Sequence, residues 1–239
     1  MTKKNNPRDD YQKIKNEKPI ENDISDPAIQ SREEEIANSI THGIGAALSI
    51  AGLSVLVSLA SRYGDTVRVV SLGIYGATLI LLYLSSTLYH SFSRGPVKHF
   101  FRFLDHSSIY LLIAGSYTPI VLVSLRGIWG WTIFAIVWIM AIGGIIAKIF
   151  ITGKSGIISV VFYIAMGWII VLAIKPILET VPLNLFIWLL IGGLSYTFGI
   201  IFYAMEKMPY NHAIWHLFVL RGSITHFFGM FFYIASIPA

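Results

Sequence analysis

Imidazole side chains recur near the carboxyl end of a chain that is otherwise strongly apolar. The segment "NHAIWH" places His212 and His216 four residues apart, so on a helix both rings lie on one face, about 40° apart around the axis. Two imidazoles with this spacing can bind one metal ion, as the two histidines of a helical H-E-x-x-H motif do. The alternative is a pair of interfacial or hydrogen-bonded polar residues, and the pair alone leaves both interpretations open.

A second helical pair, Ser86 and His90 in "SSTLYH", has the same spacing. If His90 joins the other two histidines, three nitrogens bind the ion and a fourth position stays open for water or substrate, which is typical of a catalytic zinc site. The chain contains no cysteine, so any metal must be bound by His, Asp or Glu. Ser86 could instead hydrogen-bond back to a carbonyl of its own helix.

Two further polar clusters interrupt apolar segments. One is "LDHSSIY", with Asp105, and the other is "EIANSITH", which contains Glu35, Asn38, Thr41 and His42. Ionisable side chains at membrane depth cost at least a few kcal/mol each, so they usually face the bundle interior and mark a site. Structural roles remain open, because Glu35 could complement a helix dipole and Asp105 could cap a helix.

The elements that must position these residues are membrane spans. The chain is 55% hydrophobic and 13% charged, with a mean hydropathy of +0.66, which excludes a soluble globular protein. A span needs about 20 mostly apolar residues. That length gives seven spans and an all-α, seven-helix polytopic membrane bundle, with spans at residues 38–60, 69–91, 104–125, 128–150, 157–175, 183–204 and 213–237. The segment "SRGPVKHFFR" is expected to be a connection, with His99 and His106 solvated.

Residues 1–34 are predicted to form a disordered cytoplasmic tail, and residues 35–239 the membrane domain. The first 35 residues hold seven Lys/Arg and nine Asp/Glu without apolar periodicity. They do not resemble a signal peptide, so the first span is expected to act as the insertion signal.

The distribution of Lys and Arg predicts the orientation. The side of the amino terminus carries 13 of them and the opposite side four, or six against four when only the loops are counted. The positive-inside rule therefore predicts a cytoplasmic amino terminus and an extracytoplasmic carboxyl terminus. The same rule accounts for the net charge of +5, so nucleic-acid binding is not expected. In this topology all four polar clusters lie at the cytoplasmic leaflet, at one depth.

Two ionisable residues lie deeper in the last span. His226 follows His212 by 14 residues, so it lies about 20 Å further along the helix and cannot bind the same ion. We expect an interhelical hydrogen bond there, with the lining of a polar tunnel or substrate cavity as the alternative. Arg221 is expected to point into the bundle or towards an acidic partner.

In combination, these motifs resemble the hemolysin III family, within the progestin and adipoQ receptor superfamily that includes the adiponectin receptors and, more distantly, alkaline ceramidases. The resemblance covers residues 33–237 and implies seven spans with a cytoplasmic amino terminus. It also implies a zinc ion near the inner leaflet bound by His90, His212 and His216, with Asp105 holding a metal-bound water and Ser86 preceding the first ligand. The carboxyl-terminal segment of hormone-responsive relatives is absent, so a receptor role is not expected.

The leading hypothesis is a multi-pass cell-membrane hydrolase that uses Zn²⁺ to cleave a lipid amide or ester, such as a ceramide-like or other acyl lipid. Asp105 would orient the water and take its proton, and Ser86 would hydrogen-bond the developing oxyanion. Asn38, together with Glu35 and His42, is expected to hold the first helix against the site. The alternatives are a protein that permeabilises membranes (cytolysis) and a non-catalytic signalling protein stabilised by zinc.

Overall fold

The computed structural model describes residues 30–92, 95–150 and 155–236, and every regular element in them is helical. Seven helices in this part of the chain are long and apolar enough to cross a membrane, which confirms the predicted all-α, seven-span fold. In chain order the elements are α2 (Arg32–Tyr63), α3 (Thr66–Ser91), α4 (Pro96–Pro119) with a π-helical end η1 (Ile120–Leu125), α5 (Gly127–Phe150), α6 (Ser155–Gly167), the 3₁₀ turn η2 (Ile169–Ala173), α7 (Ile174–Thr180), α8 (Leu183–Tyr203) and α9 (Asn211–Met230) with a π-helical end η3 (Phe231–Ala235). The predicted tail lies outside the described residues through residue 29 and stays a prediction.

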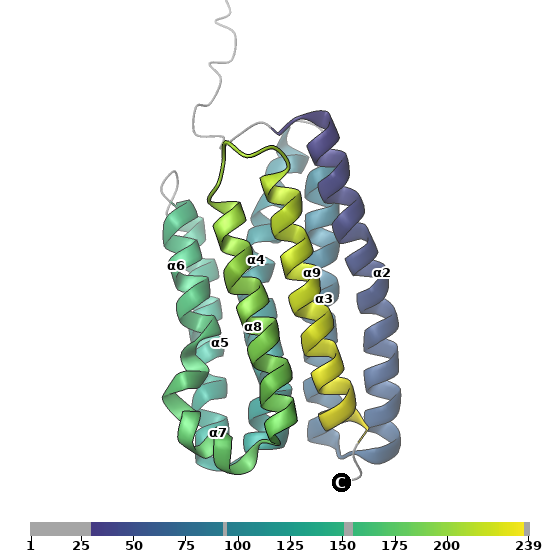
Figure 1. The fold of residues 1–239 in the computed structure, drawn as a ribbon, viewed down its shortest axis with the longest axis vertical. Coiled ribbons are helices and arrows are strands. Elements are labelled where there is room, and N and C mark those ends of the chain that lie inside the picture. The colour runs from purple at the N-terminus through teal and green to yellow at the C-terminus, as the bar shows by residue number, and fades with distance from the viewer. Residues whose placement is uncertain (1–29, 93–94, 151–154, 237–239) are drawn as a thin grey trace, which may run out of the picture. The chain divides into compact units, whose positions relative to one another are not determined.

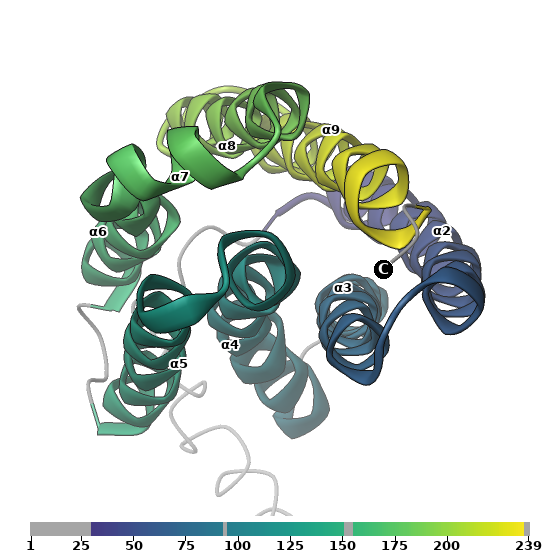
Figure 2. The same cartoon turned by 90° about the horizontal axis from the view of Figure 1, so that it is seen from below.

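The spans alternate in direction, so the starts of α2, α4 and α9 and the end of α3 meet at one end of the bundle (Figure 1). We call this the site end. Viewed along the helices, α6, α8, α9 and α2 follow an arc, and α3, α4 and α5 lie on its open side (Figure 2). Helix α3 packs against both α2 and α4, and α9 packs against both α8 and α2. The four polar clusters are therefore neighbours in space.

Helix α4 begins earlier than the hydropathy predicts. Pro96 occupies its first turn, directly after Gly95, where a missing main-chain N–H has no helical partner to lose. The prediction of a connection at this segment is wrong, because His99 and His106 both lie on α4; His99 is exposed as expected, whereas His106 is half-buried. Asp105 lies nine residues inside the helix, so the alternative role of a helix cap is also wrong.

Arg221 does not point into the bundle, contrary to expectation. The residue is exposed on the outer face of α9, whereas Gly222, Ser223 and His226 beside it are buried. Arginine can lay its long apolar stem along the helix and carry its charged group away from its Cα towards water. An arginine on the outer face of α9 is therefore tolerated.

The fifth span is interrupted. Pro176 has no main-chain N–H, and its ring excludes a regular helical bond to the carbonyl four residues before it. The backbone accordingly tightens into η2 between α6 and α7. Tyr117 of α4 compensates, because its hydroxyl donates to the Gly167 carbonyl at 2.7 Å and accepts from the Ile170 N–H at 3.1 Å. A side chain thus satisfies main-chain groups that the break leaves open.

This contact predicts that Tyr117→Phe lowers the free energy of unfolding by about 1–3 kcal/mol, because two buried main-chain groups lose their partner. Thermal unfolding of the purified protein in detergent measures the change. Tyr210→Phe is the matched control, since its ring is 45% exposed. Equal melting temperatures for the two variants would contradict the assigned role of Tyr117.

Candidate metal centre

Three histidines converge at the site end. His90 comes from the last turn of α3, and His212 and His216 come from the first two turns of α9. One nitrogen from each ring lies within 4.8 Å of those of the other two, so the group could hold one metal ion. The i, i+4 pair and the third ligand from another helix meet as the spacing and the shared depth predict.

The buried nitrogens of these rings provide a test of whether a metal fits. Nε2 of His90, Nε2 of His212 and both nitrogens of His216 are buried without a hydrogen-bond partner of good geometry among the described residues. The main-chain carbonyl of Asn38 interacts with the His216 ring outside that geometry. An unpaired buried polar group costs roughly 1–3 kcal/mol, so several side by side need an explanation. A cation bound by their lone pairs supplies one.

Glu35 orients the first of these rings. Its Oε2 lies 2.6 Å from Nδ1 of His90, and its Oε1 accepts a 2.6 Å hydrogen bond from Nζ of Lys98. A carboxylate only accepts, so Nδ1 carries the proton and Nε2 presents its lone pair to the centre. Metal-binding histidines are commonly oriented by a carboxylate in this manner. The first helix is therefore in contact with the site through Glu35.

His42, about two turns further along α2 than Glu35, lies flat against one of the three rings. The His42 and His216 ring centroids are 3.5 Å apart with an interplanar angle of 12°. The Tyr83 ring of α3 is nearly perpendicular to the His42 ring, with centroids 5.0 Å apart. This packing fixes the plane of His216. Thr41 is not part of the site, because its hydroxyl bonds back to the Ala37 carbonyl at 2.6 Å.

Asp105 and Ser86 lie beside the three histidines without joining them. Both are buried, at 4% and 0% exposure, and Asp105 is within electrostatic reach of His90 and of Lys148 from α5. Ser86 Oγ faces Asp105 and makes no bond back to its own helix; its neighbour Ser85 makes that bond, to the Leu81 carbonyl at 2.6 Å. The alternative of a self-satisfied Ser86 is therefore wrong. A buried carboxylate, with a hydroxyl facing it, therefore lies near His90.

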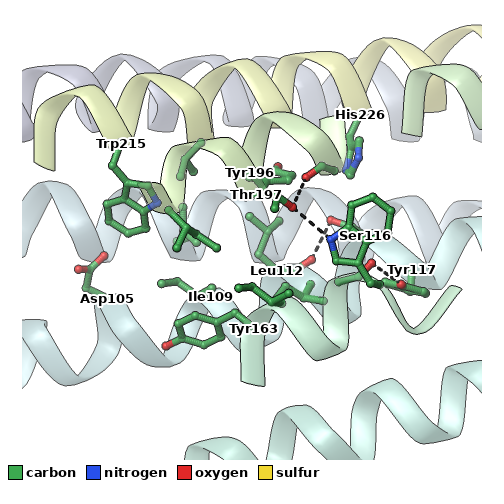
Figure 3. A pocket seen from close by; sticks show the side chains of 18 of the residues that line it. Asp105, Ile109, Leu112, Ser116, Tyr117, Tyr163, Tyr196, Thr197, Trp215 and His226 are labelled. Atoms are coloured by element: carbon green, nitrogen blue, oxygen red, sulfur yellow. Dashed lines mark hydrogen bonds between the residues drawn. The ribbon is translucent and has the colours of Figure 1, made fainter. Parts of the chain in front are cut away.

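A cavity of about 150 Å³ leads from this point along α4, between it and α6, α8 and α9. Asp105 and Trp215 lie at one end, and Tyr117, Thr197 and His226 at the other (Figure 3). Asp105 and Tyr117 are twelve residues apart on one helix, which corresponds to about 18 Å. Most of the wall between them is aliphatic or aromatic, including Ile109 and Leu112. The Asp105 carboxylate thus lies at one end of a long, mostly apolar space.

Sequence reasoning missed two cations of the site, Lys98 and Lys148. Both count as basic residues near span ends, where a topological role accounts for them. Lys98 is found only once α4 is extended back to Pro96, because it then lies two residues inside a helix that faces Glu35. The proline after a glycine in "RGPVK" is the signal that could have shown it.

The fold and the site define an integral membrane protein that carries a candidate three-histidine metal centre at one end of a seven-helix bundle. A scan against protein-family models matches residues 30–227 to the family described as "Haemolysin-III related". The chain belongs to this family, which confirms the resemblance seen in its motifs.

Similar proteins come from bacteria and mammals. "Hemolysin-3" of Bacillus cereus is 54% identical and covers 84% of this chain and 92% of that protein. "Hemolysin-3 homolog" of Bacillus subtilis (strain 168) is 46% identical, with 86% and 97% coverage. The human "Monocyte to macrophage differentiation factor" is 30% identical, with 86% coverage of each, which is consistent with the predicted superfamily. No solved structure matches the chain.

The cluster predicts that His212→Ala and His216→Ala each remove stoichiometric metal from the purified protein, because two imidazoles cannot retain an ion that needs three. Elemental analysis after dialysis gives the metal content. His99→Ala, at an exposed position of the same end, should leave it unchanged. Full occupancy in both cluster variants would refute the metal centre.

The contact between Glu35 and His90 predicts that Glu35→Gln weakens metal binding roughly 10–100-fold without abolishing it, because the imidazole loses its orienting anion. Competition with a chelator of known affinity measures the change. Glu33→Gln neutralises an exposed carboxylate on the same turn and serves as the control. Equal affinities for the two variants would exclude the orienting role.

Proposed function

We propose that this protein is a zinc-dependent hydrolase that cleaves amide or ester bonds of membrane lipids, with its centre at the cytoplasmic leaflet. The observation that carries the proposal is the position of the buried Asp105, which lies within electrostatic reach of His90 in the three-histidine cluster and also lines the apolar cavity. The depth and orientation rest on the excess of Lys and Arg on the side of the amino terminus.

The donor set supports zinc. Three neutral imidazoles and an open fourth position are typical of catalytic zinc sites, whereas calcium and magnesium prefer oxygen ligands. When bound, zinc supplies a Lewis acid that polarises a carbonyl and acidifies a water molecule. Glu35 keeps the proton of His90 on Nδ1, so that Nε2 stays available as a ligand.

Asp105 is suited to moving the proton. Hydrolysis joins the oxygen of water to the carbonyl carbon, breaks the bond to the amide nitrogen or ester oxygen, and transfers one proton from the water to that leaving group. A carboxylate beside the centre can accept the proton and deliver it. Lys148 on α5 faces the same carboxylate and compensates its charge. We assign to the Ser86 hydroxyl, which faces Asp105, the role of donating a hydrogen bond to the oxyanion that develops on the carbonyl.

The cavity supports an acyl substrate. Its mostly apolar wall would cover a long acyl chain, and Asp105 lies at one end, where the carbonyl of the lipid would lie. The competing function, permeabilisation of target membranes, is favoured by the name of the Bacillus cereus relative. A protein that permeabilises another cell must leave its own membrane, and seven apolar spans oppose that transfer. We therefore place hydrolysis first.

Turnover tests the proposal. Purified metal-loaded protein is incubated with ceramides and other acyl lipids, and released fatty acid is quantified. Asp105→Asn keeps the shape of the side chain and should lower turnover at least 100-fold while the metal content stays the same. Glu179→Gln, at an exposed position on α7, is the control.

The other outcomes decide between the alternatives. Metal binding without fatty-acid release from any lipid would favour the zinc-stabilised signalling protein. Leakage of dye from liposomes that is the same with Asp105→Asn as with the unaltered protein would favour permeabilisation. Either result would overturn the hydrolase.

A further inference from the structure

The end of the cavity remote from the metal centre carries a histidine of its own. His226 lies ten residues after His216 on α9, about 15 Å further along the axis, so it cannot reach the ion. Its side chain lines the cavity and the residue is only 9% exposed (Figure 3). Nε2 lies 3.1 Å from the carbonyl oxygen of Leu189 on α8, which supplies the interhelical hydrogen bond that the sequence predicts.

That hydrogen bond fixes the tautomer of His226. A carbonyl oxygen can only accept, so Nε2 carries the proton and Nδ1 of the neutral ring presents a lone pair. Nδ1 is buried without a hydrogen-bond partner within the described part of the chain. A buried acceptor that stays unpaired costs roughly 1–3 kcal/mol, so this atom calls for a donor.

The position of the ring is fixed as well. A Cβ at Gly192 would overlap Cδ2 of the ring and leave Nε2 only 2.5 Å away, so the edge that carries these two atoms packs directly against α8. Tyr196 approaches the ring edge-to-face, with centroids 5.4 Å apart. Nδ1 therefore lies on the opposite edge of a ring that cannot turn freely.

The neighbouring polar groups already have partners. The Tyr196 hydroxyl is 2.9 Å from Ser223 Oγ, and Ser116 donates to the Leu112 carbonyl at 2.8 Å. Thr197 Oγ1 donates to the Gly193 carbonyl and accepts from Trp168 Nε1. Among the side chains described at this end of the cavity, Nδ1 of His226 is thus an acceptor without a partner.

We propose that His226 is a specificity-determining residue that selects an acyl chain bearing a hydroxyl group about 15 Å from the metal centre. The inference rests on the proposed function in one respect, that the cavity holds an acyl chain. The hydroxyl donates to Nδ1, and a plain chain leaves that acceptor unpaired. A site built around a polar group rejects the analogue that lacks the matching group much more strongly than an apolar wall rejects an added methylene.

Binding, not turnover, tests the inference. Full-length, metal-loaded protein in nanodiscs is equilibrated with radiolabelled stearic acid, and empty nanodiscs correct for uptake by lipid. Unlabelled stearic acids with one hydroxyl, moved stepwise along the chain, compete for the cavity. We expect one mid-chain position to bind about tenfold more tightly than stearic acid and the other positions to show no gain.

Two variants of equal side-chain shape separate the acceptor from the packing. His226→Leu should abolish the preference for the hydroxyl and retain binding of stearic acid, whereas His226→Asn, whose amide oxygen can accept, should keep part of it. Gly192→Ala leaves the imidazole in the protein but displaces it, and should shift or remove the preferred position.

The contrary outcomes are distinct. Binding of stearic acid without preference for any hydroxyl position overturns the role of His226 and leaves the hydrolase standing. An equal preference in His226→Leu overturns it too, because the selected group then has another partner. No binding of any fatty acid by the unaltered protein overturns both this inference and the acyl cavity of the proposed function.

Discussion

The Glu35 carboxylate joins three helices at the point where the bundle carries its charge. From α2 it contacts His90 at the end of α3 and Lys98 at the start of α4, at 2.6 Å in each case. An isolated carboxylate or ammonium group at membrane depth costs at least a few kcal/mol, and pairing them removes much of that penalty. The same contact sets the tautomer of His90. The contacts of this one carboxylate therefore both join the ends of the three helices and orient a candidate metal ligand.

The remaining architecture separates a polar end from an apolar interior. α9 supplies two of the three histidines in its first turns, α2 packs His42 flat against one of them, and α4 brings Asp105 to the same level. Beyond that level the cavity between α4 and the arc of α6, α8 and α9 is walled mainly by aliphatic and aromatic side chains. The proposed lipid substrate would match both parts, because it joins a carbonyl group to a long apolar chain.

Much of this arrangement is predictable from the sequence, for identifiable reasons. Seven apolar lengths with alternating direction are enough to bring His90 to the end of the bundle that holds His212 and His216. The start of α4 is not predictable from hydropathy, because "GPVKHFFR" is basic although it is helical. The break at η2 is hidden for the opposite reason, since its residues are as apolar as the helices on either side. The Leu189 carbonyl that pairs with His226 is main chain and carries no signal in the sequence at all.

Helix α9 carries both a histidine of the three-histidine cluster, His216, and the histidine that lines the far end of the cavity, His226. His216 and His226 lie on one continuous helix, so a fixed rise of about 1.5 Å per residue sets their separation. Rotation of α9 is limited where it meets α8, because Gly222 lies against the Tyr196 ring and Gly199 against Phe218 and Trp215, with no room for a larger side chain. A shift of α9 that moved His226 would also move the metal ligands. In the proposed function, selection at one end of the acyl chain and chemistry at the other would therefore be coupled through a rigid element, without a conformational signal between them.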